Sequence, residues 1–350
     1  MIDSKIADEE LELADSLDSI NDTFYRNGWT DGLPIVPPVR ERVDGMVSAS
    51  GLPADHLGAE IPPKMGRATV EKIAINGVMA GCLPAYMPVL VAAITALADD
   101  RYDLKGRQTT THAGAPLLIV NGPIVKRIGM NYGAGCFGPG WRPNATIGRA
   151  IRLILMNIGG AIPGEIDSAT HGHPGKYTYC IAENEDANPW EPLHVERGFP
   201  RATSTVTVVN AEGPHSINDS RSKTALGILV TCASTMSTLG ANNLYYQGQP
   251  ILVLGPEHAA KLARDGLSKY DVKAFLYEKA RQPARLVRGR GMEVGKEFPR
   301  WLDLADDQEM VPIAHRPDDI IVIVAGGGGA KSMCVPTAGR QSLSVTKPIQ

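Results

Sequence analysis

Four apolar runs, each closed by glycine or by a turn that contains glycine and proline, constrain the fold of this 350-residue chain most strongly. Valine, isoleucine and threonine are frequent in them, which favours strands, and the continuous apolar run Pro116–Asn121 is typical of a strand buried on both faces. The runs are Pro116–Asn121, Thr203–Asn210, Ile251–Leu254 and Asp319–Ala325. Turns follow each run, because glycine permits a sharp bend and proline suits the first position of a helix.

Helical segments alternate with these runs. They are expected at Ala145–Ile158, Arg221–Thr238, Glu257–Asp265 and Lys269–Arg281. Strands that alternate with helices predict an α/β fold with a largely parallel sheet and flanking helices. The stretches that begin at Leu118 and Leu252 resemble each other, since both continue through an apolar run into Gly-Pro. This similarity predicts two related α/β halves, residues 116–200 and 201–350, behind a helical N-terminal region, residues 1–115.

Residues 73–98 carry no charged side chain and are long enough to span a bilayer. The segment contains Pro84 and Pro88, however, and proline inside a helix removes a hydrogen-bond donor and clashes with the preceding turn. We therefore expect two buried helices broken near Leu83–Pro84, and no membrane span. Met1–Glu12 is acidic and lacks an apolar signal core, which favours a cytoplasmic protein.

Composition argues against several classes of function. The net charge is −3 at pH 7, with 35 basic against 38 acidic residues, so no nucleic-acid partner is expected. The five cysteines are odd in number and form no Cys-x-x-Cys pair, which fits reduced thiols better than disulfides. The chain has no Gly-Lys-Ser/Thr of a P-loop, and we expect no nucleotide cofactor.

The candidate site lies between Asn131 and Arg197. A run of glycines, Gly133–Gly140, precedes an expected helix, so its backbone N–H groups can converge on an anion, and Arg142 can add a paired contact. The alternative is a structural loop that turns beneath Trp141. Cys136, inside the run, can be a nucleophile, because thiols near helix N-termini have a lowered pKa, or a buried apolar residue.

His171-x-His173 is the strongest candidate for chemistry, because residues two apart on an extended segment point to the same side. Three interpretations stay open. The pair can bind a divalent metal that His194, Glu183 or Glu185 completes, or one histidine can act as a general base while Lys176 holds a substrate carboxylate, or both histidines can cap turns. Glu183 is a further acid–base candidate, unless it belongs to a solvated loop.

The apolar helix expected at residues 145–158 contains two arginines, Arg149 and Arg152. A buried arginine needs an anionic partner, because an unpaired buried charge is costly. We expect Glu165 or Asp167 to be the structural partner of Arg152. For Arg149 the anionic partner can be either a structural carboxylate or a substrate carboxylate.

Parallel α/β sheets bind ligands beyond the carboxyl ends of their strands. If the four turns share one rim, they form a single crevice with the glycine run and the two histidines. This arrangement predicts substrate contacts from Gly133, Gly135, Gly138, Asn144, Tyr179, Glu212, His215, Gly327, Gly328 and Ser332. The simpler alternative is that the glycine–proline turns only begin helices.

The stretch Asp319–Cys334 resembles the strand-and-loop core of the UGSC-type bacterial domain family, named for a selenocysteine- or cysteine-bearing loop after an apolar strand. Residues 64–197 also resemble longer proteins associated with that family. The blocks that carry this second likeness are Ala74–Cys82, Asn144–Arg149 and His173–Asn184. The resemblance implies a thiol-dependent oxidoreductase that uses Cys136 or Cys334. Gly326–Ala330 contains neither cysteine nor selenocysteine, so the sequence departs from the redox motif.

The sequence therefore favours an enzyme that acts on a small, polar, carboxylate-bearing substrate by acid–base or metal-assisted chemistry, as a lyase, hydratase or hydrolase. The alternatives are the thiol-dependent oxidoreductase and a non-catalytic subunit of a heteromeric enzyme. A divalent metal is the one candidate cofactor. Apolar helices such as Val89–Ala98 can form a subunit interface, so a homo-oligomer is expected.

Overall fold

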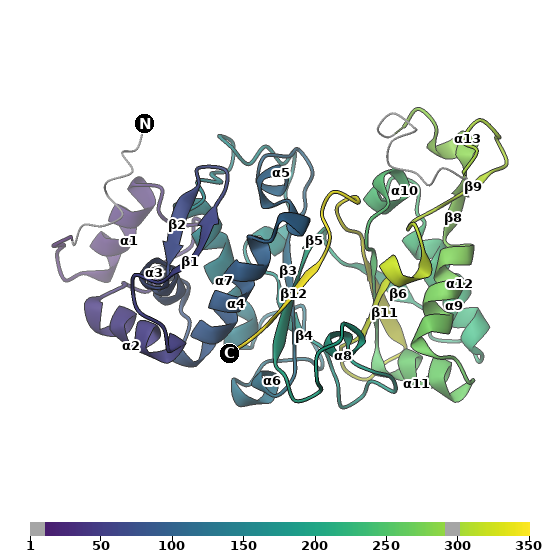
Figure 1. Cartoon of the computed structure of the whole chain (residues 1–350), viewed down its shortest axis with the longest axis horizontal. Helices are drawn as coiled ribbons and strands as arrows, with labels where there is room; N and C mark the ends of the chain where they lie inside the picture. The colour runs from purple at the N-terminus through teal and green to yellow at the C-terminus, as the bar shows by residue number, and fades with distance from the viewer. Residues whose placement is uncertain (1–10, 291–301) are drawn as a thin grey trace.

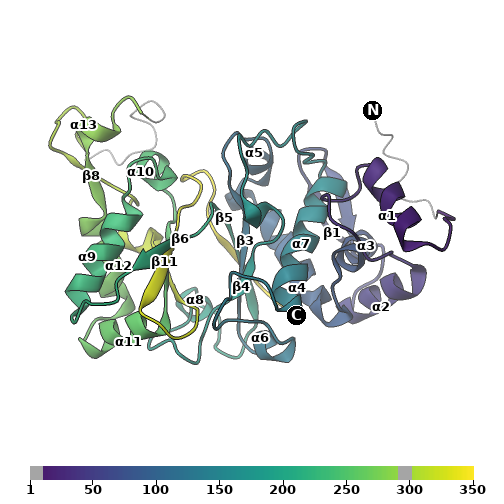
Figure 2. The same ribbon diagram turned by 180° about the vertical axis from the view of Figure 1, so that it is seen from behind.

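The computed structural model describes residues 11–290 and 302–350 and shows a mixed α/β protein built in four layers. Two four-stranded sheets face each other in the middle, and helices cover the outer face of each sheet (Figure 1). The described residues contain thirteen α-helices and two further two-stranded sheets. The N-terminal and C-terminal helices lie at opposite ends of the molecule, as the reverse view also shows (Figure 2).

The first sheet has the strand order β12-β5-β3-β4, and the second has the order β10-β7-β11-β6. The strands of the first are β12 (Val345–Pro348), β5 (Thr205–Ala211), β3 (Ala115–Asn121) and β4 (Cys180–Ala182). The strands of the second are β10 (Ile321–Val324), β7 (Ile251–Leu254), β11 (Lys331–Val335) and β6 (His215–Asn218). The four apolar runs predicted as strands are thus confirmed as β3, β5, β7 and β10.

Side chains of the central strands alternate between two cores, because successive residues of a strand point to opposite faces of the sheet. Leu117 and Ile119 of β3 share a core with Val253 of β7, between the two sheets. Leu118 and Val120 point the other way, into a core built with the N-terminal helices. A sheet on one side and helices on the other explain why β3 and β7 carry apolar side chains on both faces.

The structure does not confirm a largely parallel sheet. Each four-stranded sheet has one parallel pair, β3–β4 or β7–β10, and two antiparallel pairs. Burial on both faces misled the prediction, since two stacked sheets produce the same apolar pattern as one parallel sheet. Connection length matters as well: only residues 325–330 join β10 to β11, whereas a parallel crossover needs about a dozen residues or more.

The two sheets exchange strands. β5 continues into β6, which lies in the second sheet, and β11 continues into β12, which lies in the first. Both sheets also have the same order of neighbours: two antiparallel pairs are followed by one parallel pair, from β12 to β4 in the first sheet and from β6 to β10 in the second. Because β5 pairs with β3, the predicted halves 116–200 and 201–350 do not form separate sheets.

Helices α3 (Val70–Ala80) and α4 (Met87–Leu97) confirm the prediction of two buried helices in the uncharged segment. Gly81 ends α3 with a φ of 92°, which glycine adopts readily, and Pro84 begins a short 3₁₀ turn before α4. Among the described residues, no helix is long and apolar enough to cross a membrane. The helical layer that covers the first sheet contains α3 and α4. It also contains α1 (Leu17–Arg26), α2 (Arg40–Ser50), β1 (Leu57–Ile61), β2 (Gly66–Thr69), α5 (Leu104–Gln108) and α7 (Arg142–Asn157).

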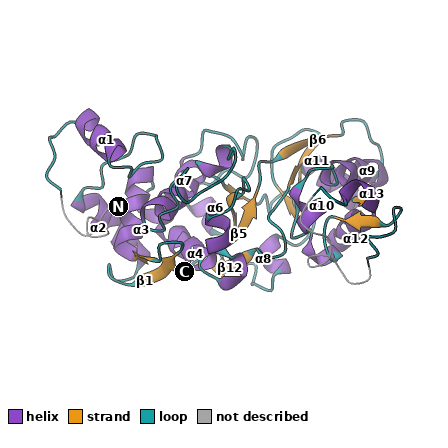
Figure 3. Cartoon of the chain, turned by 90° about the horizontal axis from the view of Figure 1, so that it is seen from above, coloured by secondary structure: helices purple, strands orange, loops and turns teal. Residues whose placement is uncertain are grey.

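The C-terminal layer covers the second sheet with α9 (Ala225–Met236), α11 (Pro256–Arg264) and α12 (Lys269–Lys279). Seen from above, strands lie between two groups of helices, so no strand of either central sheet forms an outer layer (Figure 3). The remaining elements are α6 (Ile124–Arg127), α8 (Leu193–Glu196), α10 (Asn242–Tyr246), α13 (Ala284–Val287), β8 (Arg281–Pro283), β9 (Met310–Pro312), and 3₁₀ turns at Pro84–Tyr86, Asp100–Tyr102, Pro174–Lys176 and Pro317–Asp319.

Candidate functional site

A pocket of about 410 Å³ lies between α7, the connector at Asp31 and the segment from 163 to 177. Met156, Pro163 and Tyr177 form part of its apolar wall. Its acidic, basic and imidazole side chains are those of Asp31, Arg152, Asp167, His171, His173 and Lys176. The structure therefore brings three of the predicted site residues, both histidines of the His-x-His pair and the lysine, into one cavity.

Arg152, near the middle of α7, is the most constrained charge in the pocket. Arg152 is only 6% exposed to solvent. Nε donates to the backbone oxygen of Lys176 at 2.8 Å, while Nη1 donates no hydrogen bond within the described residues and lies 3.7 Å from Asp167. Burial lowers the pKa of Arg152, and Asp167 opposes that shift. Asp167 is one of the two structural partners that the sequence suggested, at ion-pair rather than hydrogen-bond distance.

Lys176 is the principal partner of Asp167. Its Nζ lies 2.8 and 2.6 Å from the two carboxylate oxygens. Burial lowers the pKa of Lys176, the Asp167 carboxylate raises it, and the positive charge of Arg152 lowers it further. Two cations thus share one carboxylate, which leaves this wall of the pocket with an excess of positive charge.

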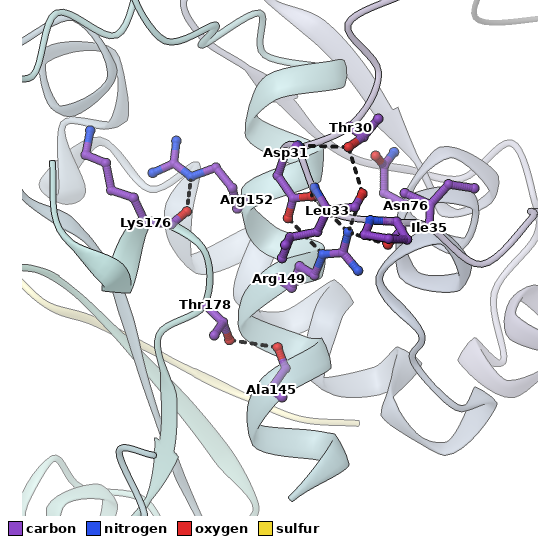
Figure 4. A network of polar contacts seen from close by, with 12 residues as sticks. Thr30, Asp31, Leu33, Ile35, Asn76, Ala145, Arg149, Arg152, Lys176 and Thr178 are labelled. Carbon is purple, nitrogen blue, oxygen red and sulfur yellow. Dashed lines mark hydrogen bonds and ion pairs between the residues drawn. The ribbon is translucent and has the colours of Figure 1, made fainter. Parts of the chain in front are cut away.

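Arg149 points away from Arg152, although both belong to α7 (Figure 4). It donates to both oxygens of Asp31 at 2.8 Å and to the backbone oxygen of Pro34 at 2.9 Å. The Asp31 side chain is only 3% exposed. Arg149 therefore fastens the N-terminal connector as a wall of the pocket and does not itself line the pocket.

His173 has a capping role. Its Nδ1 accepts a hydrogen bond from Gly175 N at 3.1 Å, so Nε2 carries the proton and faces the backbone oxygen of Ala211 at 3.3 Å. Burial lowers the pKa of His173. With both nitrogens engaged, this ring fits the turn-capping interpretation better than that of a general base. His171 is exposed, lines the pocket and makes no hydrogen bond within the described residues.

A cluster of polar side chains, formed by His112, Tyr179 and Glu212, lies beside His173. His112 Nε2 lies 2.8 Å from Glu212 Oε1, and the hydroxyl of Tyr179 donates to the backbone oxygen of Glu212 at 2.8 Å. The rings of Tyr179 and His173 are 5.6 Å apart. Sequence reasoning missed His112 because it assumed parallel strands. In the antiparallel pair, Ala211 at the end of β5 lies opposite the start of β3, which places Glu212 beside His112.

The two glycine-rich loops lie against each other and outside the pocket. Gly326 N donates to Tyr132 O at 2.9 Å, and a Cβ on Gly327 would meet the Cβ of Ala134 at 2.7 Å. None of the predicted glycines Gly133, Gly135, Gly138, Gly327 and Gly328 lines the pocket. Gly133, Gly135 and Gly138 have Gly-x-Gly-x-x-Gly spacing, but the loop follows α6 rather than a strand, so it lacks the strand that precedes a dinucleotide-binding motif.

Other predicted anion contacts are structural. Asn144 exchanges two 2.8 Å hydrogen bonds with the backbone of Asn131 and so fixes the glycine loop to α7. Arg142 donates to Gly81 O at 2.9 Å. Ser332 is 4% exposed and lies 2.8 Å from His258 Nδ1, within the second sheet and its helices. His215 is exposed on β6, opposite Cys334.

Glu183 and His194 are buried away from the pocket, at 1% and 0% exposure. The Glu183 carboxylate accepts hydrogen bonds from Asn121, Asn188 and the backbone of Leu193, and burial raises its pKa. His194 Nε2 lies 3.3 Å from the backbone oxygen of Arg201. Within the described residues, no three His, Cys, Asp or Glu side chains are grouped to hold a metal, so the set His171, His173 and His194 is not assembled.

All five cysteines are buried and unpaired with one another in disulfides. Burial raises the pKa of Cys136 to about 11 and that of Cys334 to about 11. Cys136 packs in the core between the sheets. A raised thiol pKa is the opposite of what a nucleophilic cysteine requires, so the geometry gives no support to thiol chemistry at either residue.

Comparison with models of known protein families found no match, and comparison with curated proteins found none either. The resemblance to the UGSC-type family therefore stays a prediction. The outstanding property of the pocket is the buried positive charge of Arg152, which shares the Asp167 carboxylate with Lys176.

Proposed function

We propose that the pocket binds a small carboxylate-bearing molecule and that the protein is an enzyme acting on it by acid–base chemistry. One observation carries the proposal: Arg152 is buried in the pocket wall with part of its guanidinium unbonded, and the carboxylate beside it, that of Asp167, is already hydrogen-bonded to Lys176. A buried charge without full compensation is costly, and a ligand carboxylate would compensate it.

Carboxylate is the group that best fits this wall. The planar guanidinium can donate two parallel hydrogen bonds to a carboxylate, which an uncharged ligand cannot match in strength. A pocket of about 410 Å³ also suits a small molecule. The apolar surface of Met156 and Pro163 would accommodate a short carbon skeleton beyond the carboxylate.

His171 is the group we assign to proton transfer. Its imidazole lines the pocket and is free of hydrogen bonds within the described residues, whereas His173 is held on both nitrogens. An imidazole that faces the pocket with both nitrogens unengaged is placed to accept a proton from a bound ligand or to donate one to it. We propose lyase, hydratase or hydrolase chemistry at this position. We propose the acid–base form of this chemistry, since His171, His173 and His194 are not grouped among the described residues.

Calorimetric titration with acetate, lactate and malonate, and with acetamide as the uncharged control, tests the proposal. We expect the carboxylates to bind and acetamide not to bind. Arg152→Gln should weaken binding about 10- to 150-fold, the equivalent of about 1.5–3 kcal/mol for hydrogen bonds to a charged group. Arg142→Gln, which removes a positive charge from the same helix outside the pocket, is the matched control and should bind as the wild type does. Equal binding by both variants would contradict the assignment.

We also propose that the two sheets descend from one repeated unit. The support is their common strand order and their reciprocal exchange of β6 and β12. Such a repeat would span residues 115–218 and 251–348 rather than the halves expected from the sequence. Self-association and a heteromeric partner stay predictions, which light scattering and co-purification respectively would test.

A further inference from the structure

We infer that Lys176 forms an imine with the carbonyl carbon of a 2-oxo acid whose carboxylate is held by Arg152. This inference rests on the proposed function and narrows its substrate class from carboxylates to 2-oxo acids. It assigns Lys176 a covalent role, whereas the sequence assigned it the binding of the carboxylate.

The first support is the position of the amine. Lys176 lines the pocket and its side chain is 16% exposed, so its amine is open to a small ligand. Primary amines on pocket walls are the groups that condense with carbonyl substrates. Lys126 provides a contrast, because it also pairs with an aspartate, Asp186, but on the open surface.

The second support is the spacing of the two cations. One oxygen of Asp167 lies 2.6 Å from Lys176 Nζ and 3.7 Å from Arg152 Nη1, so the two nitrogens are at most about 6.3 Å apart. In a 2-oxo acid the carbonyl carbon is bonded directly to the carboxylate carbon. A carboxylate that binds Arg152 at hydrogen-bond distance therefore places the adjacent carbonyl within reach of Nζ.

The third support is Asp167, which can accept and return the protons of the condensation. It accepts a proton from the Lys176 ammonium, and the free amine attacks the carbonyl carbon to form the new N–C bond. The carbonyl electron pair moves to oxygen, which Asp167 protonates. Loss of a second N–H proton through Asp167 then accompanies cleavage of the C–O bond. One ammonium and one carbonyl give one protonated imine and one water, without an oxidant or a reductant.

The surroundings of Lys176 also make it easier to remove a proton from its ammonium group. Burial lowers the pKa of Lys176 and the charge of Arg152 acts in the same direction, although Asp167 opposes them. Deprotonation of the nitrogen is therefore easier than for an exposed lysine, and imine formation should begin at a lower pH than at a surface amine.

Reductive trapping tests the inference on the full chain. The protein is incubated with pyruvate and sodium cyanoborohydride, and the modified lysine is located by peptide mass mapping. We expect one dominant adduct at Lys176, at least tenfold above Lys126. Lactate, which has the carboxylate but no carbonyl, should compete. Acetone, which has the carbonyl but no carboxylate, should show no preference for Lys176.

Variants separate the two proposals. Lys176→Arg keeps the positive charge and should abolish the adduct, Arg152→Gln should reduce labelling at least tenfold, and Lys126→Arg should have no effect. If lactate binds calorimetrically but pyruvate labels Lys176 no faster than Lys126, imine chemistry is wrong and carboxylate binding stands. If neither lactate nor pyruvate binds, the proposed function itself fails. The wild-type peptide map decides the question even if Lys176→Arg does not fold.

Discussion

Replacing Arg149 by glutamine should destabilise the fold strongly, whereas the same change at Arg152 should not. Arg149 donates to both oxygens of Asp31 at 2.8 Å, and that carboxylate has a side-chain exposure of only 3%. The substitution would leave a buried carboxylate without its cation. Removing one partner of a buried ion pair costs about 3–5 kcal/mol, and we expect Arg149→Gln to lower the free energy of unfolding by that amount.

Arg152→Gln has two opposing effects. It removes the hydrogen bond from Nε to the backbone of Lys176, which is worth about 1 kcal/mol. It also removes a buried charge that only shares Asp167, while the Lys176–Asp167 pair remains intact. We therefore expect the free energy of unfolding of the ligand-free variant to lie within about 1 kcal/mol of the wild type, because the two effects are similar in size.

Urea unfolding followed by circular dichroism measures both variants under one condition. Adding Asp31→Asn to Arg149→Gln should restore at least about 1 kcal/mol, because the uncompensated carboxylate is then gone. The reasoning is refuted if Arg152→Gln costs as much as Arg149→Gln. That result would mean that the Arg152 guanidinium is fully compensated in the folded protein and has no unmet need for a ligand.

Three further predictions concern packing, pH and thiols. Gly148→Ala should lower the free energy of unfolding by about 1–3 kcal/mol in the same urea assay, because its Cβ would lie 2.5 Å from Tyr179 N, whereas Gly133→Ala, whose nearest neighbour is at 3.6 Å, should cost less. Burial lowers the pKa of His173, so the unfolded chain binds that proton more tightly. Stability should therefore fall as pH drops below about 6.5, and His173→Gln should flatten this slope in urea titrations at several pH values. All five cysteines are buried, so a thiol-specific chromogenic reagent should react with them slowly in buffer and rapidly in urea; rapid labelling of Cys136 or Cys334 in buffer would revive the thiol hypothesis.

The apolar runs identified their strands, because burial on both faces leaves a mark in the sequence. Strand direction leaves no such mark, and the pattern around Ile119 and Val253 is the same whether a helix layer or a second sheet covers each face. Pairing was decided by connection lengths and by the exchange of β6 and β12, which are properties of the whole chain. The break at Pro84 was predictable because proline acts locally.

The site was predictable where its residues are neighbours in sequence. His171, His173 and Lys176 reach one pocket because a single turn carries them. The cost of burying Arg152 pointed correctly to Asp167 as a partner. Contacts across the fold were not predictable: Arg149 binds Asp31, although 118 positions separate the two residues in the sequence. The role of the glycine loops was not predictable from sequence, because glycine marks close backbone contact as readily as ligand binding, and the structure places the two loops against each other outside the pocket.

The most direct test of the central claim is a crystal structure of the protein in complex with lactate. Our account predicts that the lactate carboxylate accepts hydrogen bonds from the terminal nitrogens of Arg152, with Lys176 still paired to Asp167. A structure in which lactate occupies another surface, while Arg152 stays closed against Asp167 at saturating ligand, would contradict it.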